Sequence, residues 1–169
     1  MPTSNENIHS LLDPCLAAGF SDPPNEEAIL ELGPRIWDSF DQAADDHAWG
    51  FLITMLMYVR ALINHERYDE ALSRALEIVD IARQSGSFAL EIDCLEEAGD
   101  ILEMFGDGEG ASRLFYEALG LATDFRHSVI DDPHLQERLS SQIEGLGEKA
   151  RTARFEFLDD ILEEKEESK

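Results

Sequence analysis

Basic residues, cysteine and proline are all scarce in this sequence, and the shortage of basic residues argues against nucleic acids and anionic membranes as partners. Only 13 of the 169 residues are Lys or Arg, against 37 Asp and Glu, which gives a formal net charge of -24 and a pI near 4.3. So much negative charge repels the phosphate backbone of nucleic acids and the surface of an anionic membrane. A basic protein partner would instead gain affinity and association rate, although acidity also serves simply to keep a protein soluble.

The two cysteines, Cys15 and Cys94, are far apart, have apolar neighbours and show no metal-ligand spacing. We therefore expect two buried free thiols. The N-terminal residues lack the basic start, apolar core and small-residue cleavage site of a signal peptide. The longest apolar stretch, residues 49–59, is too short to span a bilayer. These features predict a cytoplasmic protein.

No stretch alternates apolar and polar residues as a half-buried strand does, whereas apolar residues recur with helical spacing along the chain. This pattern predicts a single all-α domain of antiparallel hairpins with about six to eight helices. We place an N-terminal helix and linker at 1–24, a degenerate helix at 25–46, and two hairpins at 47–86 and 87–127. Residues 133–165 form a C-terminal capping helix or hairpin, and Gly145 and Gly147 favour the hairpin.

Two segments repeat one pattern of small and large residues. The first contains Tyr68, Ala71, Ala75 and Ile78, and the second contains Gly108, Ala111, Phe115 and Ala118. Ala71 and Ala111 are 40 positions apart, and Leu95, Ala98, Gly99 and Leu102 precede the second segment. The pattern resembles tetratricopeptide repeats of the longer-period type, with weaker matches at Gly147, Ala150 and Phe157. The resemblance implies a short superhelix of stacked hairpins that binds other proteins.

The resemblance also implies which residues line the concave groove of such a stack. On the front helix of the second repeat they are Asp93, Glu96, Asp100 and Glu103. Their spacings of three, four and three place all four carboxylates on one helix face. On the preceding front helix this face is mostly apolar, and we expect the N-terminal helices to bury it, leaving Arg60 and Asn64 as polar neighbours of the groove.

An acidic groove of this kind would bind a basic or apolar segment of a protein partner and reject an acidic C-terminal tail. The alternative is that the four carboxylates are only the solvated face of an amphipathic helix. We expect an adaptor or regulator, with an immunity protein or secretion chaperone that neutralises a basic toxin or effector as the alternative. Self-association as a homodimer also stays open.

Signals for catalysis are sparse. The sequence has no Gly-rich phosphate loop, no Gly-x-Ser-x-Gly elbow and no His-Glu-x-x-His pair. Glu96-Glu97-x-x-Asp100 resembles half of the magnesium site of all-helical nucleotide pyrophosphatases, but the matching segment on the preceding helix is missing. We therefore predict a non-enzymatic protein without cofactor or metal and keep the pyrophosphatase as a minor alternative.

Overall fold

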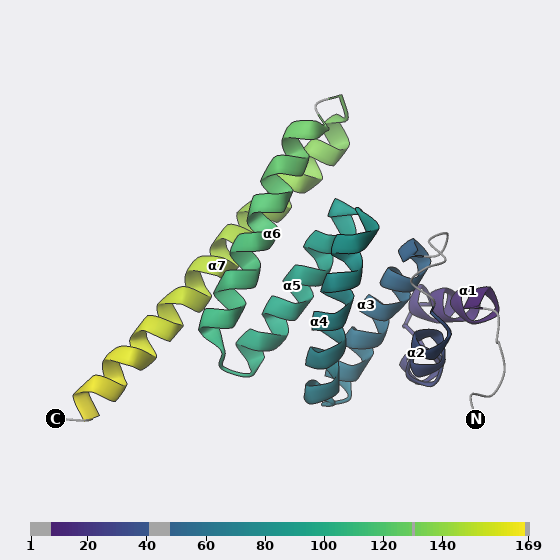
Figure 1. Ribbon diagram of the computed structural model, residues 1–169, viewed down its shortest axis with the longest axis horizontal. Coiled ribbons are helices and arrows are strands. Elements are labelled where there is room, and N and C mark those ends of the chain that lie inside the picture. The colour runs from purple at the N-terminus through teal and green to yellow at the C-terminus, as the bar shows by residue number, and fades with distance from the viewer. Residues whose placement is uncertain (1–7, 41–47, 130, 168–169) are drawn as a thin grey trace. The chain divides into compact units, whose positions relative to one another are not determined.

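The computed structural model describes residues 8–40, 48–129 and 131–167, with side chains as far as Arg154. Within these ranges the chain forms seven helices and no strand, which confirms the predicted all-α fold of six to eight helices (Figure 1). The helices are α1 (Ile8–Gly19), α2 (Glu26–Ser39), α3 (Ala48–Asn64), α4 (Tyr68–Ser85), α5 (Phe88–Met104), α6 (Gly108–Ser128) and α7 (Pro133–Glu167). None of the described helices combines the length and apolar character needed to cross a bilayer.

Helix ends follow local sequence signals. The sequence predicts N-caps at Asn25 and Asp132, and their side chains accept hydrogen bonds from backbone N–H groups three residues further on, at 3.2 and 3.0 Å, at the starts of α2 and α7. Gly86 and Gly106 have φ values of +69° and +77°, the left-handed conformation with which α4 and α5 end. The sequence also predicts a helix cap at Asp45-Asp46, which lies outside the described residues.

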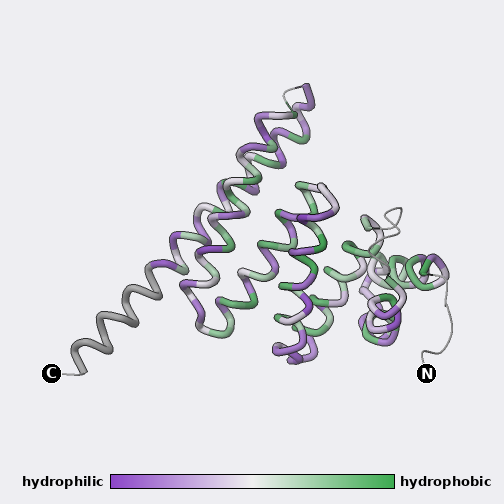
Figure 2. The backbone as a smooth tube through the Cα atoms, viewed as in Figure 1, coloured by the Kyte–Doolittle hydropathy of each residue, from purple (hydrophilic) through white to green (hydrophobic). Residues whose placement is uncertain are grey.

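The chain divides into two compact units, residues 1–90 (unit 1) and 91–169 (unit 2). That the two units together form the single predicted domain stays a prediction. In both units most helices carry hydrophobic as well as hydrophilic residues (Figure 2), which is typical of helices that bury one side. Both cysteines are buried and free, as expected, and burial raises the pKa of Cys15 to about 11 and that of Cys94 to about 12.

In unit 1, α3 is the central helix and contacts α1, α2 and α4. Its almost uniformly apolar sequence predicts this position, and its largest fully buried side chains are Tyr58, Phe51, Leu52, Met55 and Leu62. Close packing depends on glycine on the neighbouring helices. Gly33 of α2 lies against the ring of Tyr58, and Gly19 of α1 lies against Met57, so that a Cβ at either glycine would overlap these side chains.

A polar network borders the buried ring of Tyr58. The Tyr58 hydroxyl donates a hydrogen bond of 2.7 Å to Oε1 of Glu70, and Arg67 binds the other oxygen of the same carboxylate. Burial, followed by the bond to Glu70, raises the pKa of Tyr58 to about 12, and the bond from Tyr58 lowers the pKa of Glu70. Arg74 lies 4.4 Å from the centre of the Trp37 ring. These contacts join α3 to α4 and α2 to α4.

Unit 2 contains α5 from Glu91 onward, α6 and α7. α6 and α7 run antiparallel: the Ser112 hydroxyl donates to the carbonyl of Ala150 at 3.1 Å, and Arg126 lies 3.5 Å from the hydroxyl of Ser140. The face of α7 turned to the core carries Leu139, Leu146, Ala150 and Ala153, all buried. Between α5 and α6, the ring of Phe115 fills the space over Gly99, where a Cβ would lie 2.5 Å from the ring.

The expectation of a hairpin broken at Gly145-Leu146-Gly147 is wrong, because α7 continues through all three residues. Leu146 is fully buried in the stripe that packs against the rest of unit 2. Of the described glycines, only Gly86 and Gly106 have positive φ, so Gly145 and Gly147 keep helical geometry. Burial of the apolar stripe outweighs the intrinsic cost of two glycines in the helix, roughly 1 kcal/mol each.

Candidate interaction surface

The four predicted groove carboxylates lie on the polar side of α5, and we call Asp93, Glu96, Asp100 and Glu103 the carboxylate stripe. The opposite side of α5 is apolar and fully buried, including Ile92, Leu95, Ala98 and Ile101. All four carboxylate residues are half-buried rather than fully exposed. The amphipathic pattern of α5 therefore positions the stripe, as the spacing predicts.

The stripe is not open to solvent along its whole length, because Lys149 of α7 lies against it. The Lys149 ammonium contacts both oxygens of Asp100, at 2.7 and 2.8 Å, and Oε1 of Glu96, at 2.9 Å. The same nitrogen lies 5.6 Å from the centre of the Phe115 ring. One cation of this chain therefore bridges two carboxylates across one turn of α5.

The surroundings of Lys149 favour its charged form. Burial alone lowers the pKa of this ammonium, but the hydrogen bonds to Asp100 and Glu96 and the charges of the two carboxylates outweigh burial. The net result is a pKa raised above the usual value of 10.5. Lys149 is therefore positively charged throughout the physiological pH range.

Gln142 binds the upstream part of the stripe, two turns before Lys149 on α7. Its side-chain Nε2 donates to Oδ1 of Asp93 at 3.1 Å and to Oε2 of Glu96 at 3.4 Å. Unlike Lys149, this amide carries no net charge. The negative charge of Asp93 is thus held in place without being neutralised by Gln142.

A shallow depression of about 500 Å³ lies where Asp93 and Glu96 face α7, and it is lined by Asp93, Glu96, Arg138, Ser141, Gln142 and Gly145. Gly145 forms an open part of this lining, since a Cβ built there meets no atom within 4 Å. Two carboxylates, one guanidinium and an amide therefore surround a space large enough for the end of a long side chain.

The six predicted site residues are divided between the two units. Asp93, Glu96 and Asp100 meet side chains of α7, and Glu103 continues the same face of α5. Arg60 and Asn64 belong to unit 1. The Asn64 amide donates to Oε1 of Glu26 at 2.6 Å, and His65 lies 3.3 Å from the other oxygen of that carboxylate, so Asn64 links α3 to α2.

The prediction that the N-terminal helices bury the apolar face of α3 is confirmed for the centre of that face. α1 and α2 both pack on α3, Leu56 is buried, and Met57 lies against Gly19 of α1.

Gln142 and Lys149 are the residues of the candidate surface that sequence reasoning missed. Two signals pointed to them: Lys149 is the only lysine among the first 164 residues, and the spacing of seven between Gln142 and Lys149 equals that between Asp93 and Asp100.

The magnesium hypothesis places a cation at Glu96 and Asp100. In the structure the Lys149 ammonium lies in that position, with three short contacts to their oxygens. Among the residues that the structure describes, no group of three or more His, Cys, Asp or Glu side chains is arranged to hold a metal ion.

Comparison of the chain with models of protein families, with curated proteins and with solved structures found no match. The likeness to tetratricopeptide repeats therefore rests on the sequence pattern alone.

Proposed function

We propose that this protein is a non-enzymatic interaction module, built as a tetratricopeptide-like helical stack, that binds a basic segment of a partner protein at the carboxylate stripe. The observation that carries the proposal is the depression beside the stripe, into which Asp93 and Glu96 both face. A lysine or arginine side chain of a partner would enter this depression, where both carboxylates would attract its positive charge.

The charge balance supports a cationic ligand. Four carboxylates lie along the stripe, and beside them α7 places the cations Lys149, at Glu96 and Asp100, and Arg138, at the depression. Half-buried carboxylates attract a cation more strongly than fully solvated ones, because the effective dielectric constant is lower there. The same carboxylates would repel an anionic segment.

Gln142 and Lys149 give the two ends of the stripe different roles. At the Asp100 end, the Lys149 ammonium already occupies the carboxylates. At the Asp93 end, the neutral Gln142 amide of α7 donates a hydrogen bond to the carboxylate, and a partner cation in its place would gain charge–charge attraction. We therefore place the partner's basic residue at Asp93 and Glu96.

Titration with a peptide of alternating arginine and proline tests the proposal, because proline prevents the peptide from forming a helix. The test variant combines Asp93→Asn, Glu96→Gln, Asp100→Asn and Glu103→Gln. The matched control removes the same number of charges from exposed positions of the same unit: Asp124→Asn, Glu137→Gln, Glu144→Gln and Glu148→Gln. Both variants keep side-chain size and change the net charge equally.

We expect the stripe variant to weaken peptide binding by about tenfold, equivalent to 1.4 kcal/mol, and the control variant to weaken it much less. Binding to the wild type should also weaken as salt is added. Equal losses in the two variants would show that the peptide responds only to net charge and would refute the proposed site.

A further inference from the structure

α7 continues well past the rest of unit 2, and two contacts define where it does so. The parallel contact between Asp100 and Lys149 brings Phe105, five residues after Asp100, level with Arg154. The antiparallel contact between Ser112 and Ala150 brings Gly108, the first residue of α6, level with the same Arg154. Both neighbours of α7 in unit 2 therefore end at this level.

Beyond Arg154, α7 extends for 13 more residues, 155–167, which we call the overhang. At a rise of 1.5 Å per residue it is about 20 Å long. Figure 1 shows this yellow end of α7 continuing past the turn between α5 and α6. Within its own unit, no described helix runs beside the overhang.

The overhang has the sequence pattern of a helix that packs against another helix. At 100° per residue, its five apolar positions fall within one arc of about 160°, namely Phe155, Phe157, Leu158, Ile161 and Leu162. Its seven acidic positions fall on the remaining arc, namely Glu156, Asp159, Asp160, Glu163, Glu164, Glu166 and Glu167. This separation is typical of a helix with one buried and one solvated side.

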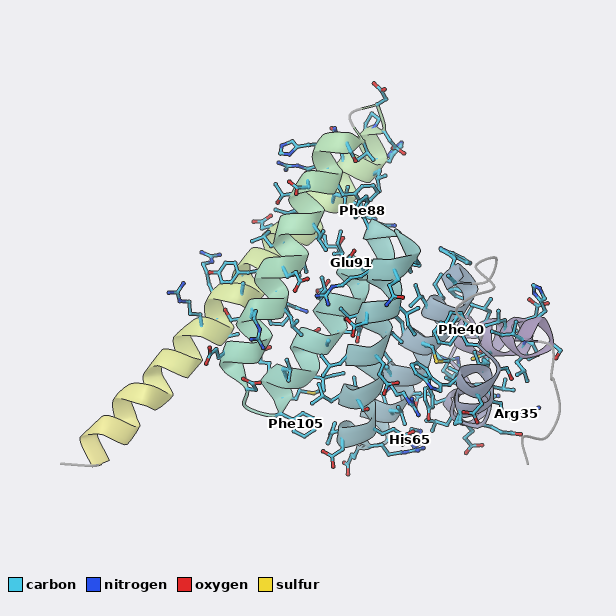
Figure 3. The ribbon with its side chains drawn as sticks, in the orientation of Figure 1. Arg35, Phe40, His65, Phe88, Glu91 and Phe105 are labelled. Atoms are coloured by element: carbon cyan, nitrogen blue, oxygen red, sulfur yellow. The ribbon has the colours of Figure 1, made fainter. Side chains whose placement is uncertain are left out.

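The end of the α5–α6 hairpin adds exposed apolar surface at the base of the overhang. Met104 and Phe105 are 54% and 45% exposed, and Phe105 lies in the turn at this end of the hairpin (Figure 3). Large apolar side chains with such exposure, next to an amphipathic helix without a helical neighbour in its unit, are typical of a protein-binding surface.

We propose that the overhang is a docking surface for an amphipathic, basic helix of a partner protein. Such a helix would cover the apolar arc and place its basic residues beside the acidic arc, in the manner of helix-in-groove recognition. Charge selects this occupant over a second copy of the chain. Two overhangs paired with each other would bring 14 carboxylates together against two lysines at position 165, which is repulsive.

The overhang consists of residues separate from the carboxylate stripe, and its docking role is independent of the function proposed there. Its probe is a synthetic leucine–lysine peptide of about 18 residues, patterned as an amphipathic helix long enough to cover the overhang. A scrambled peptide of identical composition has the same charge but no apolar face. Fluorescence anisotropy of the labelled peptides measures binding to the full-length protein.

We expect the patterned peptide to bind about tenfold more tightly than the scrambled one, because only the patterned peptide buries an apolar face. The double variant Phe157→Gln/Ile161→Gln should remove this preference and keep the thermal stability of the wild type. Leu76→Gln, which replaces an exposed apolar residue of unit 1, should leave the preference intact. The stripe variant should also keep it, which separates this test from that of the proposed function.

Three results would overturn the proposal. The first is equal binding of the patterned and scrambled peptides. The second is a wild-type dimer in light scattering that Phe157→Gln/Ile161→Gln dissociates, because a second copy would then be the occupant. The third is a clear fall in the melting temperature of that variant, since the apolar arc would then pack within the chain itself.

Discussion

At the scale of single residues, Lys149 joins α7 to the carboxylate stripe of α5. It bridges Glu96 and Asp100, and it is the only lysine before position 165 in a chain with 37 acidic residues. Removal of its charge would leave neighbouring carboxylates on α5 without the cation that separates them. The energetic result depends on their half-buried setting, where repulsion is screened less than at a fully exposed surface.

Lys149→Met keeps most of the side-chain stem and removes the ammonium. We expect the variant to lower the free energy of unfolding by about 1 to 2 kcal/mol at neutral pH, between the values for exposed and buried ion pairs. Urea denaturation measures the change. Arg151→Met is the matched control on the next exposed position of α7, and it should cost less than about 0.5 kcal/mol.

The pH dependence gives this prediction a second readout. Because the folded state raises the pKa of Lys149 above 10.5, its contribution is complete below pH 10.5 and disappears as the pH rises through the folded value. The difference in stability between the wild type and Lys149→Met should therefore be constant near neutrality and shrink at strongly alkaline pH. A difference no larger than that of Arg151→Met would show that the bridge contributes nothing.

At the scale of helices, the sequence signals were sufficient for the start of α2, the start of α7 and the end of α4. In each case one residue determines the outcome: Asn25, Asp132 and Gly86 act through their own side chain or backbone freedom. Gly145 and Gly147 misled the prediction, because their local preference is weak and the burial of Leu146 opposes it. Tertiary packing decides such a case, and local sequence does not show it.

The same error concealed the α7 side of the candidate surface. A hairpin broken at Gly145 would have separated Gln142 from Lys149 and turned them in different directions. In the continuous helix they lie two turns apart on one face, and that distance matches the two turns from Asp93 to Asp100 on α5. The carboxylates could be predicted from spacing within one helix, whereas their partners depended on contacts between residues 49 positions apart.

Glycine-to-alanine substitutions test this account of α7. At Gly145 and Gly147 a Cβ meets no atom within 4 Å, so alanine adds helix propensity without overlap and should stabilise the protein by about 0.5 to 1 kcal/mol per site. At Gly99 a Cβ would lie 2.5 Å from the Phe115 ring, and the overlap should destabilise the protein by about 1 to 3 kcal/mol. Thermal unfolding compares the three single variants. A loss of stability at Gly145 and Gly147 would contradict a continuous helix there.

At the scale of the whole molecule, the acidic charge is distributed over both units. Residues 1–90 contain 15 acidic and 5 basic residues, and residues 91–169 contain 22 and 8, for net charges of -10 and -14. Excess charge of one sign destabilises a compact state through self-repulsion, whichever surface it lies on. The ion pairs act in the opposite direction, but most of those described join residues three or four positions apart on one exposed helix face and contribute little.

Repulsion should therefore outweigh attraction, and salt should stabilise the protein. Between about 10 and 200 mM sodium chloride the Debye length falls from roughly 30 Å to below 10 Å, which screens repulsion between distant carboxylates more than contacts at 3 Å. We expect a gain of about 1 kcal/mol, or about 2 to 4 °C in melting temperature for a chain of this size. The variant that neutralises the four stripe carboxylates starts with less repulsion and should gain less. A melting temperature that falls with salt would mean that attractive pairs, including the bridge at Lys149, dominate the electrostatic energy of the fold.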